Sequence, residues 1–392
     1  MFFKKKKTEN NKNNVKVLPN ALAVCSNGHT FSLEKYYECP FCNPSALKKE
    51  TTDDDTKKTG PHGTRIITLS ADKTPGSDGE GITRISIIGE PLKSFTSEGL
   101  ERLGGGAEGT VYALDDDRIL KIYRNADELQ IRKWYRNIRT VSNCGIRCAK
   151  AYEMVKADEG YGIIFERLDG KNLGWTINDN PDKLDDYALK MGLLLKKLHS
   201  SKDDSNTFER ITERMLGDLK IVEERQLASG ADVEMIKDFF RSIVDRNTLV
   251  HSDYHEGNII VDQEGELVLI DLDRMGVGHP IYDLIGNYLN HDVLLAKNPQ
   301  FAIKSWGLDG ERISRIKRIM LESYFGTGDE SRLNEYLDVV RNAFYVRATL
   351  LSVSPLLGKD DDEAKKAYIK DRLSALSCSV KELSGRINNL PI

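Results

Sequence analysis

Apolar residues recur at strand spacing in one stretch of this chain and at helix spacing in the next. Short β-rich runs predict strands between residues 96 and 168, with one helical segment among them. The strand-like runs are Thr110–Leu114, Arg118–Tyr123, Tyr152–Val155 and Gly160–Leu168, and the helical segment is Asn125–Ile138. From residue 169 the spacing is mainly that of amphipathic helices, as in Leu184–His199 and Gly310–Phe325. The pattern predicts an α+β protein in which a small strand-rich part precedes a larger helical part.

The segment before these elements is polar and lacks regular apolar spacing. Residues 47–95 are rich in Lys, Thr, Asp, Gly and Ser, which is the composition of a flexible linker. Two similar pieces, Gly63–Ile67 and Ile82–Ile88, are candidates for short strands or for extended segments that dock on a partner. A sharper alternative is phosphorylation of Thr64 and Thr83, which would add about −1.5 to −2 of charge beside an arginine.

Composition and charge narrow the class of protein. A chain of 392 residues is long for one hydrophobic core, so two or more domains are expected. The net charge of −4 argues against non-specific nucleic-acid binding by the chain as a whole. No apolar run approaches the roughly 20 residues that a membrane-spanning helix needs. The lysine-rich residues 1–20 predict a disordered tail without the apolar segment of a signal peptide. We therefore expect a cytoplasmic protein that neither enters a membrane nor binds nucleic acid.

Four potential metal ligands lie near the N-terminus. Cys25 and His29 are followed, after a nine-residue spacer, by Cys39 and Cys42. Two such pairs supply the four N/S ligands of a tetrahedral Zn²⁺ site, and a unit this small needs the metal to be stable. Residues 21–46 resemble a zinc ribbon of the rubredoxin-like type, with a structural zinc and a possible protein partner. The alternative is a few free thiols beside a surface histidine.

A glycine-rich turn lies at the start of the strand-rich part. Gly104, Gly106 and Gly109 form a G-x-G-x-x-G pattern, with Val111 two residues later. A Rossmann site would need a helix immediately after the last glycine, whereas here a strand-like run follows. The next strand-like run carries Lys121 in its interior. Strand, glycine hairpin, strand, turn and lysine-bearing strand follow the order found in protein kinases, which this stretch resembles.

A polar loop between two apolar runs carries the strongest candidate chemistry. It reads His251-Ser252-Asp253-Tyr254-His255-Glu256-Gly257-Asn258 and precedes Ile259-Ile260-Val261. Polar side chains are expensive to bury, so a function explains them better than packing does. Asp253 is suited to accept a proton from a hydroxyl group, and Asn258 to hold a metal ion. Asp271 follows another apolar run, and Mg²⁺ prefers such hard oxygen ligands.

The motifs H-S-D-Y-H-E-G-N, I-D-L-D and P-I-Y-D-L resemble those of the aminoglycoside/choline-kinase-type phosphotransferases, over about residues 100–351. The resemblance implies a two-lobed protein-kinase-like fold, with a β-rich N-lobe at 96–168 and a helical C-lobe at 169–392. It also implies ATP, Mg²⁺ and transfer of the γ-phosphoryl group to a hydroxyl group of the substrate. In the same way Tyr282 and Asp283 would brace the polar loop.

The resemblance also assigns a role to each motif residue. Asp253 would be the catalytic base or orient the substrate, and Asn258 and Asp271 would be the Mg²⁺ ligands. Lys121 would neutralise the α- and β-phosphates, with Glu128 as its carboxylate partner and Asp127 as the fallback. The residues expected to bind the nucleotide are Gly104, Gly106, Gly109, Val111, Lys121, Glu128, Glu166 and Leu168, the last two in a hinge-like segment.

The acceptor is the open question at this point. About a dozen residues separate Asp271 from Asp283, which leaves little room for the activation segment on which protein kinases bind a peptide. The first hypothesis is therefore a kinase of a small hydroxylated molecule. One alternative is a serine/threonine protein kinase that phosphorylates a partner or its own linker. Another is a nucleotide-binding scaffold that recruits a partner through the ribbon.

Four ring-bearing side chains in the helical part are interpreted as structural. His199 lies at the end of a predicted helix, a position that favours an end-capping role over a catalytic one. For His291, Trp306 and Tyr324 we expect core or surface packing rather than a place in an acceptor pocket.

Overall fold

The computed structural model describes most of the chain from residue 92 onwards. Side chains are described for residues 92–105, 109–203, 208–354 and 361–392, and the backbone alone for 22–24, 30–32, 64–67 and 85–88. These parts fall into two compact units. Unit 1 consists of residues up to Arg139 together with Ala151–Glu166, and unit 2 consists of Thr140–Lys150 together with Arg167–Ile392.

Four short strands precede residue 92 and form one sheet. They are β1 (Leu22–Val24), β2 (Thr30–Ser32), β3 (Thr64–Ile67) and β4 (Ile85–Ile88), in the order β2-β1-β4-β3. β3 and β4, which come from the two similar pieces, pair antiparallel, and β4 pairs parallel with β1. Strands therefore connect the expected ribbon and the expected linker. The proposed zinc ligands, Cys25, His29, Cys39 and Cys42, lie outside the described residues, as does Gly106.

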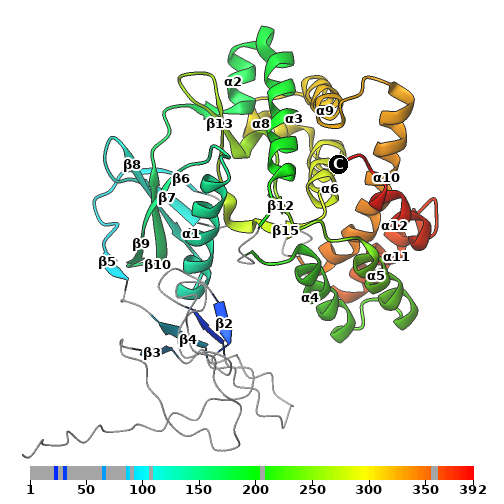
Figure 1. Cartoon of the computed structure of the whole chain (residues 1–392), viewed down its shortest axis with the longest axis horizontal. Coiled ribbons are helices and arrows are strands. Elements are labelled where there is room, and N and C mark those ends of the chain that lie inside the picture. Colours follow the sequence, from blue (N-terminus) through cyan, green and yellow to red (C-terminus); the bar gives the residue numbers. More distant parts are fainter. Residues whose placement is uncertain are drawn as a thin grey trace, which may run out of the picture. The chain divides into compact units, whose positions relative to one another are not determined.

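A six-stranded sheet forms the centre of unit 1 (Figure 1). Its order is β5-β9-β10-β8-β7-β6, and only β5 and β9 run parallel. The strands are β5 (Lys93–Phe95), β6 (Arg102–Gly105), β7 (Gly109–Ala113), β8 (Arg118–Tyr123), β9 (Ala151–Ala157) and β10 (Gly160–Glu166). Leu120, Ile122 and Ile164 form its buried core with Val155. β5 lies inside the segment expected to be linker, so the ordered sheet begins slightly earlier than predicted.

The helix of unit 1 packs on this sheet through an aromatic contact. α1 (Glu128–Asn143) buries Ile131 and Ile138 on one face, as its spacing predicts. The ring centroid of Trp134 lies 4.9 Å from that of Tyr123 on β8. The helix begins at Glu128, a few residues after Asn125, where the sequence pattern predicted its start.

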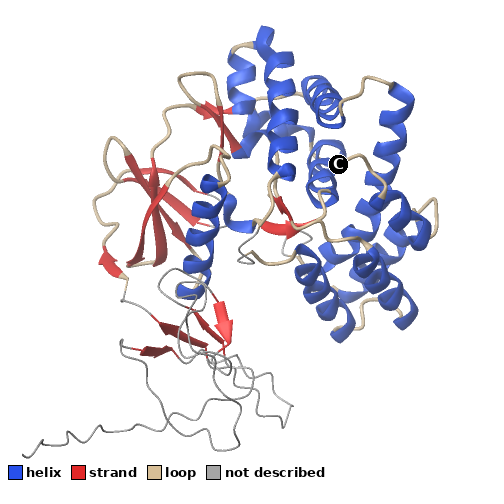
Figure 2. Cartoon of the chain, in the orientation of Figure 1, coloured by secondary structure: helices blue, strands red, loops and turns tan. Residues whose placement is uncertain are grey.

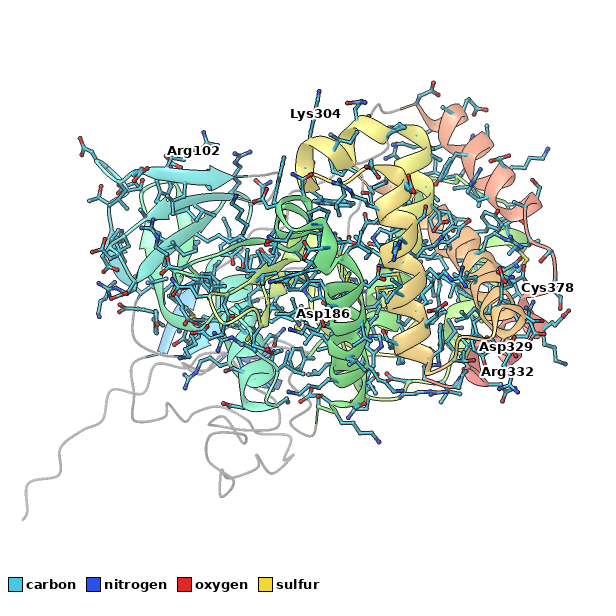
Figure 3. The ribbon with its side chains drawn as sticks, turned by 90° about the horizontal axis from the view of Figure 1, so that it is seen from above. Arg102, Asp186, Lys304, Asp329, Arg332 and Cys378 are labelled. Atoms are coloured by element: carbon cyan, nitrogen blue, oxygen red, sulfur yellow. The ribbon has the colours of Figure 1, made fainter. Side chains whose placement is uncertain are left out.

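Unit 2 consists mainly of helices (Figure 2). The helices are α2 (Leu173–Asp179), α3 (Leu184–Ser200), α4 (Ile211–Glu224), α5 (Gly230–Ser242), α6 (Ile281–Tyr288), α7 (Leu295–Lys297), α8 (Pro299–Trp306), α9 (Gly310–Phe325), α10 (Glu330–Thr349), α11 (Asp362–Ser374) and α12 (Val380–Asn388). α3 and α9 pack closely because α3 carries a glycine at the contact: a Cβ atom on Gly192 would lie 2.2 Å from the Met320 carbonyl oxygen. Asp329 caps α10 by accepting hydrogen bonds from the Ser331 and Arg332 N–H groups. Figure 3 labels Asp329 and Arg332.

Two small sheets hold the loops of unit 2 in place. One has the order β11-β13-β14, built from β11 (Lys171–Asn172), β13 (Ile259–Val261) and β14 (Leu267–Leu269). The other pairs β12 (Thr248–Val250) with β15 (Gly276–Gly278). The polar loop, residues 251–258, connects β12 of one sheet to β13 of the other, so both of its ends are anchored by backbone hydrogen bonds.

The architecture confirms the predicted fold class. The strand-rich part precedes the helical part, and glycine hairpin, lysine strand, helix and two further strands follow one another in protein-kinase-like order. In the portions of the chain that the structure describes, no helix has the length and apolarity required to span a bilayer.

Candidate functional site

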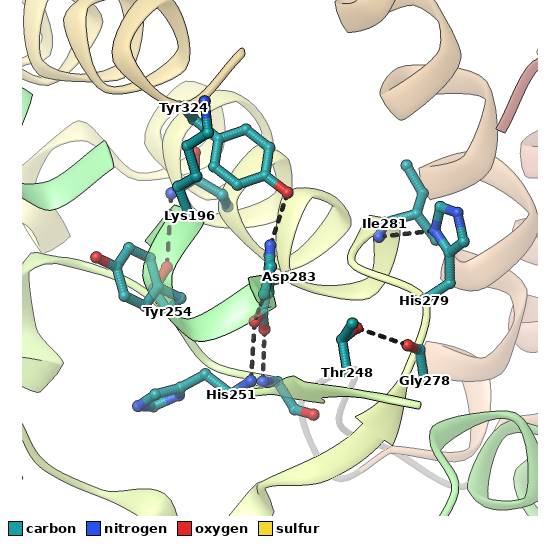
Figure 4. A network of polar contacts seen from close by, with 12 residues as sticks. Lys196, Thr248, His251, Tyr254, Gly278, His279, Ile281, Asp283 and Tyr324 are labelled. Atoms are coloured by element: carbon teal, nitrogen blue, oxygen red, sulfur yellow. Dashed lines mark hydrogen bonds and ion pairs between the residues drawn. The ribbon is translucent and has the colours of Figure 1, made fainter. Parts of the chain in front are cut away.

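The carboxylate of Asp283 stabilises the start of the polar loop through backbone hydrogen bonds. It lies on α6, is fully buried, and accepts from two successive backbone groups. The His251 N–H donates to Oδ2 at 2.8 Å and the Ser252 N–H donates to Oδ1 at 2.6 Å. Figure 4 shows these contacts between the Asp283 carboxylate and the backbone at His251. The bracing role expected for Asp283 is confirmed, whereas the Tyr282 hydroxyl contacts Thr212 Oγ1 at 3.0 Å instead.

These contacts stabilise a backbone conformation that a non-glycine residue seldom adopts. Ser252 has φ 71°, in the left-handed region. That conformation costs on the order of 1–3 kcal/mol and persists only where the surroundings impose it. Two short charge-assisted hydrogen bonds that the buried Asp283 carboxylate accepts are such surroundings. The next residue, Asp253, has a side chain that is 44% exposed.

A buried histidine and tyrosine fix Asp283 in turn. His199 Nε2 lies 2.9 Å from Asp283 Oδ2, and His199 Nδ1 lies 2.6 Å from the Tyr324 hydroxyl oxygen. A carboxylate only accepts, so Nε2 carries the proton and the Tyr324 hydroxyl donates to Nδ1 when the ring is neutral. Burial raises the pKa of Tyr324, which keeps this hydroxyl protonated. His199 is a helix-end residue, as predicted, but it also positions the brace of the polar loop.

Asp253 and Asn258 meet at the open end of the loop. Asn258 Nδ2 donates to the Asp253 carbonyl oxygen at 3.0 Å and to Oδ2 at 3.3 Å. On the other side, His255 Nε2 lies 3.6 Å from Asp253 Oδ1, an ion-pair distance too long for a hydrogen bond. The Gly257 N–H donates to His255 Nδ1 at 3.0 Å, so in neutral His255 the proton is on the nitrogen that faces Asp253.

The electrostatic environment keeps Asp253 ionised. Burial raises the pKa of this carboxyl, but the contact with His255 and the charges of His251 and Arg274 outweigh that cost. The pKa of Asp253 is therefore held below its usual range. A carboxylate of this kind accepts a hydrogen bond from a hydroxyl at neutral pH and orients it, and it is a weak base on its own.

Asp271 follows β14 and is tied to the same loop through the backbone. The Ile270 N–H donates to the Asn258 carbonyl oxygen at 3.0 Å, and His251 Nε2 lies 3.2 Å from the Ile270 carbonyl oxygen. Asp271 itself has φ 60°, the second left-handed non-glycine residue at this site. Strained backbone at Asp271 and at Ser252, the residue before Asp253, is typical of a functional site.

The donor atoms here suit Mg²⁺. Because Asn258 Nδ2 faces Asp253, the amide oxygen Oδ1 is the atom left to bind a metal, and Asp271 adds a carboxylate. One or two protein oxygens, completed by phosphate and water, form the usual Mg²⁺ site. Among the described residues there is no cluster of three His, Cys, Asp or Glu side chains of the kind that holds a metal with protein ligands alone.

The glycines of the hairpin in unit 1 differ in how much space surrounds them. A Cβ atom on Gly109 would lie 2.2 Å from the Ile122 carbonyl oxygen, so this glycine permits the close approach of β7 to β8. Gly105 is also constrained, because a Cβ atom there would lie 2.9 Å from the Gly109 carbonyl oxygen, whereas around Gly104 nothing described lies within 4 Å. The nucleotide contact of Gly104 stays a prediction.

Lys121 and Val111 lie opposite each other on neighbouring strands. The two residues are partners in the β7–β8 register, so their side chains share one face of the sheet. Lys121 Nζ lies over the Tyr123 ring, 4.7 Å from its centroid. Glu128, expected to pair with Lys121, receives Arg132 Nη2 at 2.8 Å and Nε at 3.1 Å in a buried bidentate contact. The Lys121–Glu128 pair stays a prediction.

The two hinge-like residues lie where unit 1 ends. Glu166 is the last residue of β10 and is paired with Arg118 in the β8 register. Leu168 follows two residues later in the segment before β11 and is partly buried. Both positions are compatible with the backbone contacts to adenine that the resemblance implies, and those contacts remain predicted.

One buried ion pair at the site has no signal in the sequence. Glu256, inside the polar loop, lies 2.9 Å from His291 Nε2, and both side chains are fully buried. Burial raises the pKa of the Glu256 carboxyl, but His291 outweighs it and holds the pKa below its usual range. The partners are 35 residues apart in the chain, and His291 belongs to the π-helical segment Leu289–Leu294 that continues α6.

The aromatic residues of the helical part are buried, as expected. Trp306 is 5% exposed and Tyr324 is 2% exposed. Trp306 nevertheless touches the site, because its ring centroid lies 5.0 Å from that of His255 in a tilted stack. Sequence spacing could not have revealed this contact, since the two residues belong to elements far apart in the chain.

A comparison with protein families matches one part of the chain. Residues 99–293 match the phosphotransferase enzyme family (APH), a range that includes the hairpin, Lys121 and the polar loop. No curated protein sequence matches the chain.

Among solved structures the chain is similar to several phosphotransferases at low identity. A gentamicin complex of the aminoglycoside phosphotransferase APH(2'')-IIa has 17% identity and a TM-score of 0.47, over 73% of this chain and 93% of that one. ADP-bound APH(2'')-Ib has 19% identity and a TM-score of 0.46, over 75% and 94% of the two chains. An ethanolamine kinase from Plasmodium vivax has 15% identity and a TM-score of 0.46, over 73% and 83%.

Proposed function

We propose that this protein transfers the γ-phosphoryl group of ATP to a hydroxyl group of a small molecule. The observation that carries the proposal is the polar loop: Asp253 is ionised, half-exposed and flanked by Asn258 and His255, on a strained backbone that Asp283 holds. The match of residues 99–293 to a phosphotransferase family supports the same chemistry.

Each residue at the site has a defined task in this reaction. Asp253 accepts a hydrogen bond from the acceptor hydroxyl and takes its proton as the new O–P bond forms, while the bond from the γ-phosphorus to the bridging oxygen breaks and ADP leaves. Lys121 and the glycine hairpin bind the phosphates of the nucleotide. Asn258 Oδ1 and Asp271 would hold Mg²⁺, which would supply charge neutralisation at the transferred group.

The segment after Asp271 supports a small acceptor over a peptide. It consists of a short turn and β15, which is hydrogen-bonded to β12. α6 and Asp283 follow at once, so the short connection is occupied by structure that holds the polar loop. A peptide-binding platform in a protein kinase needs a longer segment at this point. A protein kinase and a nucleotide-binding scaffold are the alternatives that the experiment below distinguishes.

Labelled ATP tests the proposal directly. Purified protein is incubated with γ-labelled ATP and Mg²⁺, together with a pool of hydroxylated metabolites or with protein extract. We expect label in small molecules, and a loss of about 10²- to 10⁴-fold in Asp253→Asn. Asp185→Asn is the matched control, because it changes an exposed aspartate that only pairs with Arg315 on the surface. Label in proteins alone would favour a protein kinase, and no Asp253-dependent transfer would favour a scaffold.

A further inference from the structure

A tryptophan ring lies beside the second histidine of the polar loop. Trp306 is the last residue of α8, and its ring centroid lies 5.0 Å from that of His255, with 32° between the two ring planes. Gly307 ends the helix directly after it, in the left-handed conformation with φ 70°, and its N–H donates to the Ile303 carbonyl oxygen at 3.0 Å. This helix end fixes the backbone that carries the tryptophan.

Two glycines make room for the tryptophan on the elements around it. A Cβ atom on Gly257, in the polar loop, would lie 2.6 Å from Trp306 Nε1 and 2.8 Å from His255 Cε1. A Cβ atom on Gly174, in the first turn of α2, would lie 2.4 Å from the Trp306 carbonyl oxygen. A larger residue at either position would displace Trp306, so the tryptophan packs closely between the loop and α2.

The orientation of the His255 ring is set by one hydrogen bond and by this packing. The Gly257 N–H donates to Nδ1 at 3.0 Å, so in the neutral ring Nε2 carries the proton and faces Asp253. The Trp306 ring fills the space beside one face of the imidazole, which leaves the imidazole little freedom to turn. The His255 side chain is 14% exposed and therefore lies mostly shielded beside the more exposed carboxylate.

Two donor groups face the two oxygens of Asp253. Asn258 Nδ2 donates to Oδ2 at 3.3 Å, and His255 Nε2 lies 3.6 Å from Oδ1. The second distance is too long for a hydrogen bond, but contacts at active sites often shorten only when the substrate is bound. Because the two donors approach different oxygens, they restrict rotation of the carboxylate about its Cβ–Cγ bond. A carboxylate fixed in this way accepts from a hydroxyl group in a defined orientation.

We propose that Trp306 and His255 are positioning residues: Trp306 fixes the His255 ring, and the Nε2–H group of His255 orients the Asp253 carboxylate toward the acceptor hydroxyl. The inference rests on the proposed function and adds two residues to its site. Both residues act through Asp253, so their loss lowers the rate of transfer and leaves the binding of ATP unchanged.

Two substitutions of His255 separate orientation from packing. His255→Phe keeps a ring that stacks on Trp306 but removes the N–H, and His255→Gln removes the ring but keeps an N–H donor of similar reach. Transfer of label to the pool of hydroxylated metabolites is measured at a fixed pool concentration while ATP is varied, which gives kcat and the KM for ATP. We expect kcat to fall about tenfold or more in His255→Phe and less in His255→Gln, with the KM for ATP little changed in both.

The opposite order of the two variants would overturn the inference. If the His255 ring only fills space, His255→Phe transfers like the wild type and His255→Gln is the slower variant. Wild-type kcat in both variants, or a loss that lies in the KM for ATP, also overturns it. Each of these outcomes leaves the proposed function intact, because transfer itself is observed.

Trp306→Phe and Trp306→Leu test the second residue. Phenylalanine keeps an aromatic face beside His255, whereas leucine fills part of the space without one. We expect kcat to fall in the order wild type, Trp306→Phe, Trp306→Leu. Trp175→Leu is the matched control, because this partly exposed tryptophan of α2 packs beside Gly307 and makes no ring contact with His255 in the described part of the chain. Circular dichroism verifies that each variant is folded. Equal losses in Trp175→Leu and Trp306→Leu would overturn the role of Trp306.

Nitrogen–proton NMR spectra of the histidine rings cover the case in which no acceptor is labelled. The proposed function then loses its support, and the effect of Trp306 on the His255 ring is judged by itself. His255 is assigned from the signals that His255→Phe lacks. In the wild type and in Trp175→Leu the neutral ring should carry its proton on Nε2 alone, whereas in Trp306→Leu both tautomers should be present. One and the same pattern in all three proteins overturns the inference.

Discussion

Replacing Asp283 by asparagine tests how the polar loop is held. The carboxylate accepts from Ser252 N–H through Oδ1, and from His251 N–H and His199 Nε2 through Oδ2. An asparagine amide offers one oxygen, so its NH₂ group must face at least one of these donors. The orientation that loses least keeps the oxygen toward His251 and His199 and places NH₂ against the Ser252 N–H.

The cost follows from those contacts. One buried donor left unsatisfied costs about 1–3 kcal/mol, and two hydrogen bonds that lose their charge assistance cost about 0.5–1 kcal/mol each. The free energy of unfolding therefore falls by about 2–5 kcal/mol. The left-handed conformation of Ser252 loses its restraint at the same time. Because Asp253 is the next residue, we expect kcat to fall by about tenfold or more.

Urea unfolding and labelled-ATP transfer measure both effects on the full chain. Asp309→Asn is the matched control, since Asp309 caps α9 by accepting from the Arg312 N–H at 2.9 Å and asparagine caps a helix about equally well. Its free energy of unfolding should stay within about 0.5 kcal/mol of the wild type. The argument is refuted if Asp283→Asn is as stable as Asp309→Asn and transfers phosphate at the wild-type rate.

Two further predictions concern the hairpin and the response to acid. Gly109→Ala brings a Cβ atom to 2.2 Å from the Ile122 carbonyl oxygen, so it should lower stability and weaken ATP binding in calorimetry. Gly104→Ala meets no described atom within 4 Å and should stay as stable as the wild type. Equal losses in both variants would contradict the packing argument. Burial lowers the pKa of His279 to about 3, while the unfolded chain takes up this proton near 6.5. The neutral ring therefore contributes stability above about pH 6.5 that is lost as the pH falls toward 3, by about 1.4 kcal/mol per unit of pH. His279→Gln should flatten the dependence of the urea midpoint between pH 6.5 and 5, and an unchanged slope would exclude His279 as its source.

The local sequence pattern was enough to predict the helices and strands and the order of the motifs. Alternation of apolar residues predicted β7, β8, β9 and β10, and helical spacing predicted α3 and α9 with nearly their observed ends. The contact between Asp253 and Asn258 was also accessible, because a five-residue separation within one loop limits how far apart two side chains can lie. Such features depend on chain geometry over a few residues, and the sequence contains that information directly.

The side-chain contacts that hold the polar loop in place could be found only from the tertiary structure. His199 and Asp283 are 84 residues apart in the chain, and Glu256 and His291 are 35 residues apart. Whether a polar side chain is buried, and which partner it meets there, depends on how helices and loops distant in sequence pack together. The physical reason is that burial makes these contacts matter: the same histidine exposed to water would have little effect on the carboxylate that it contacts.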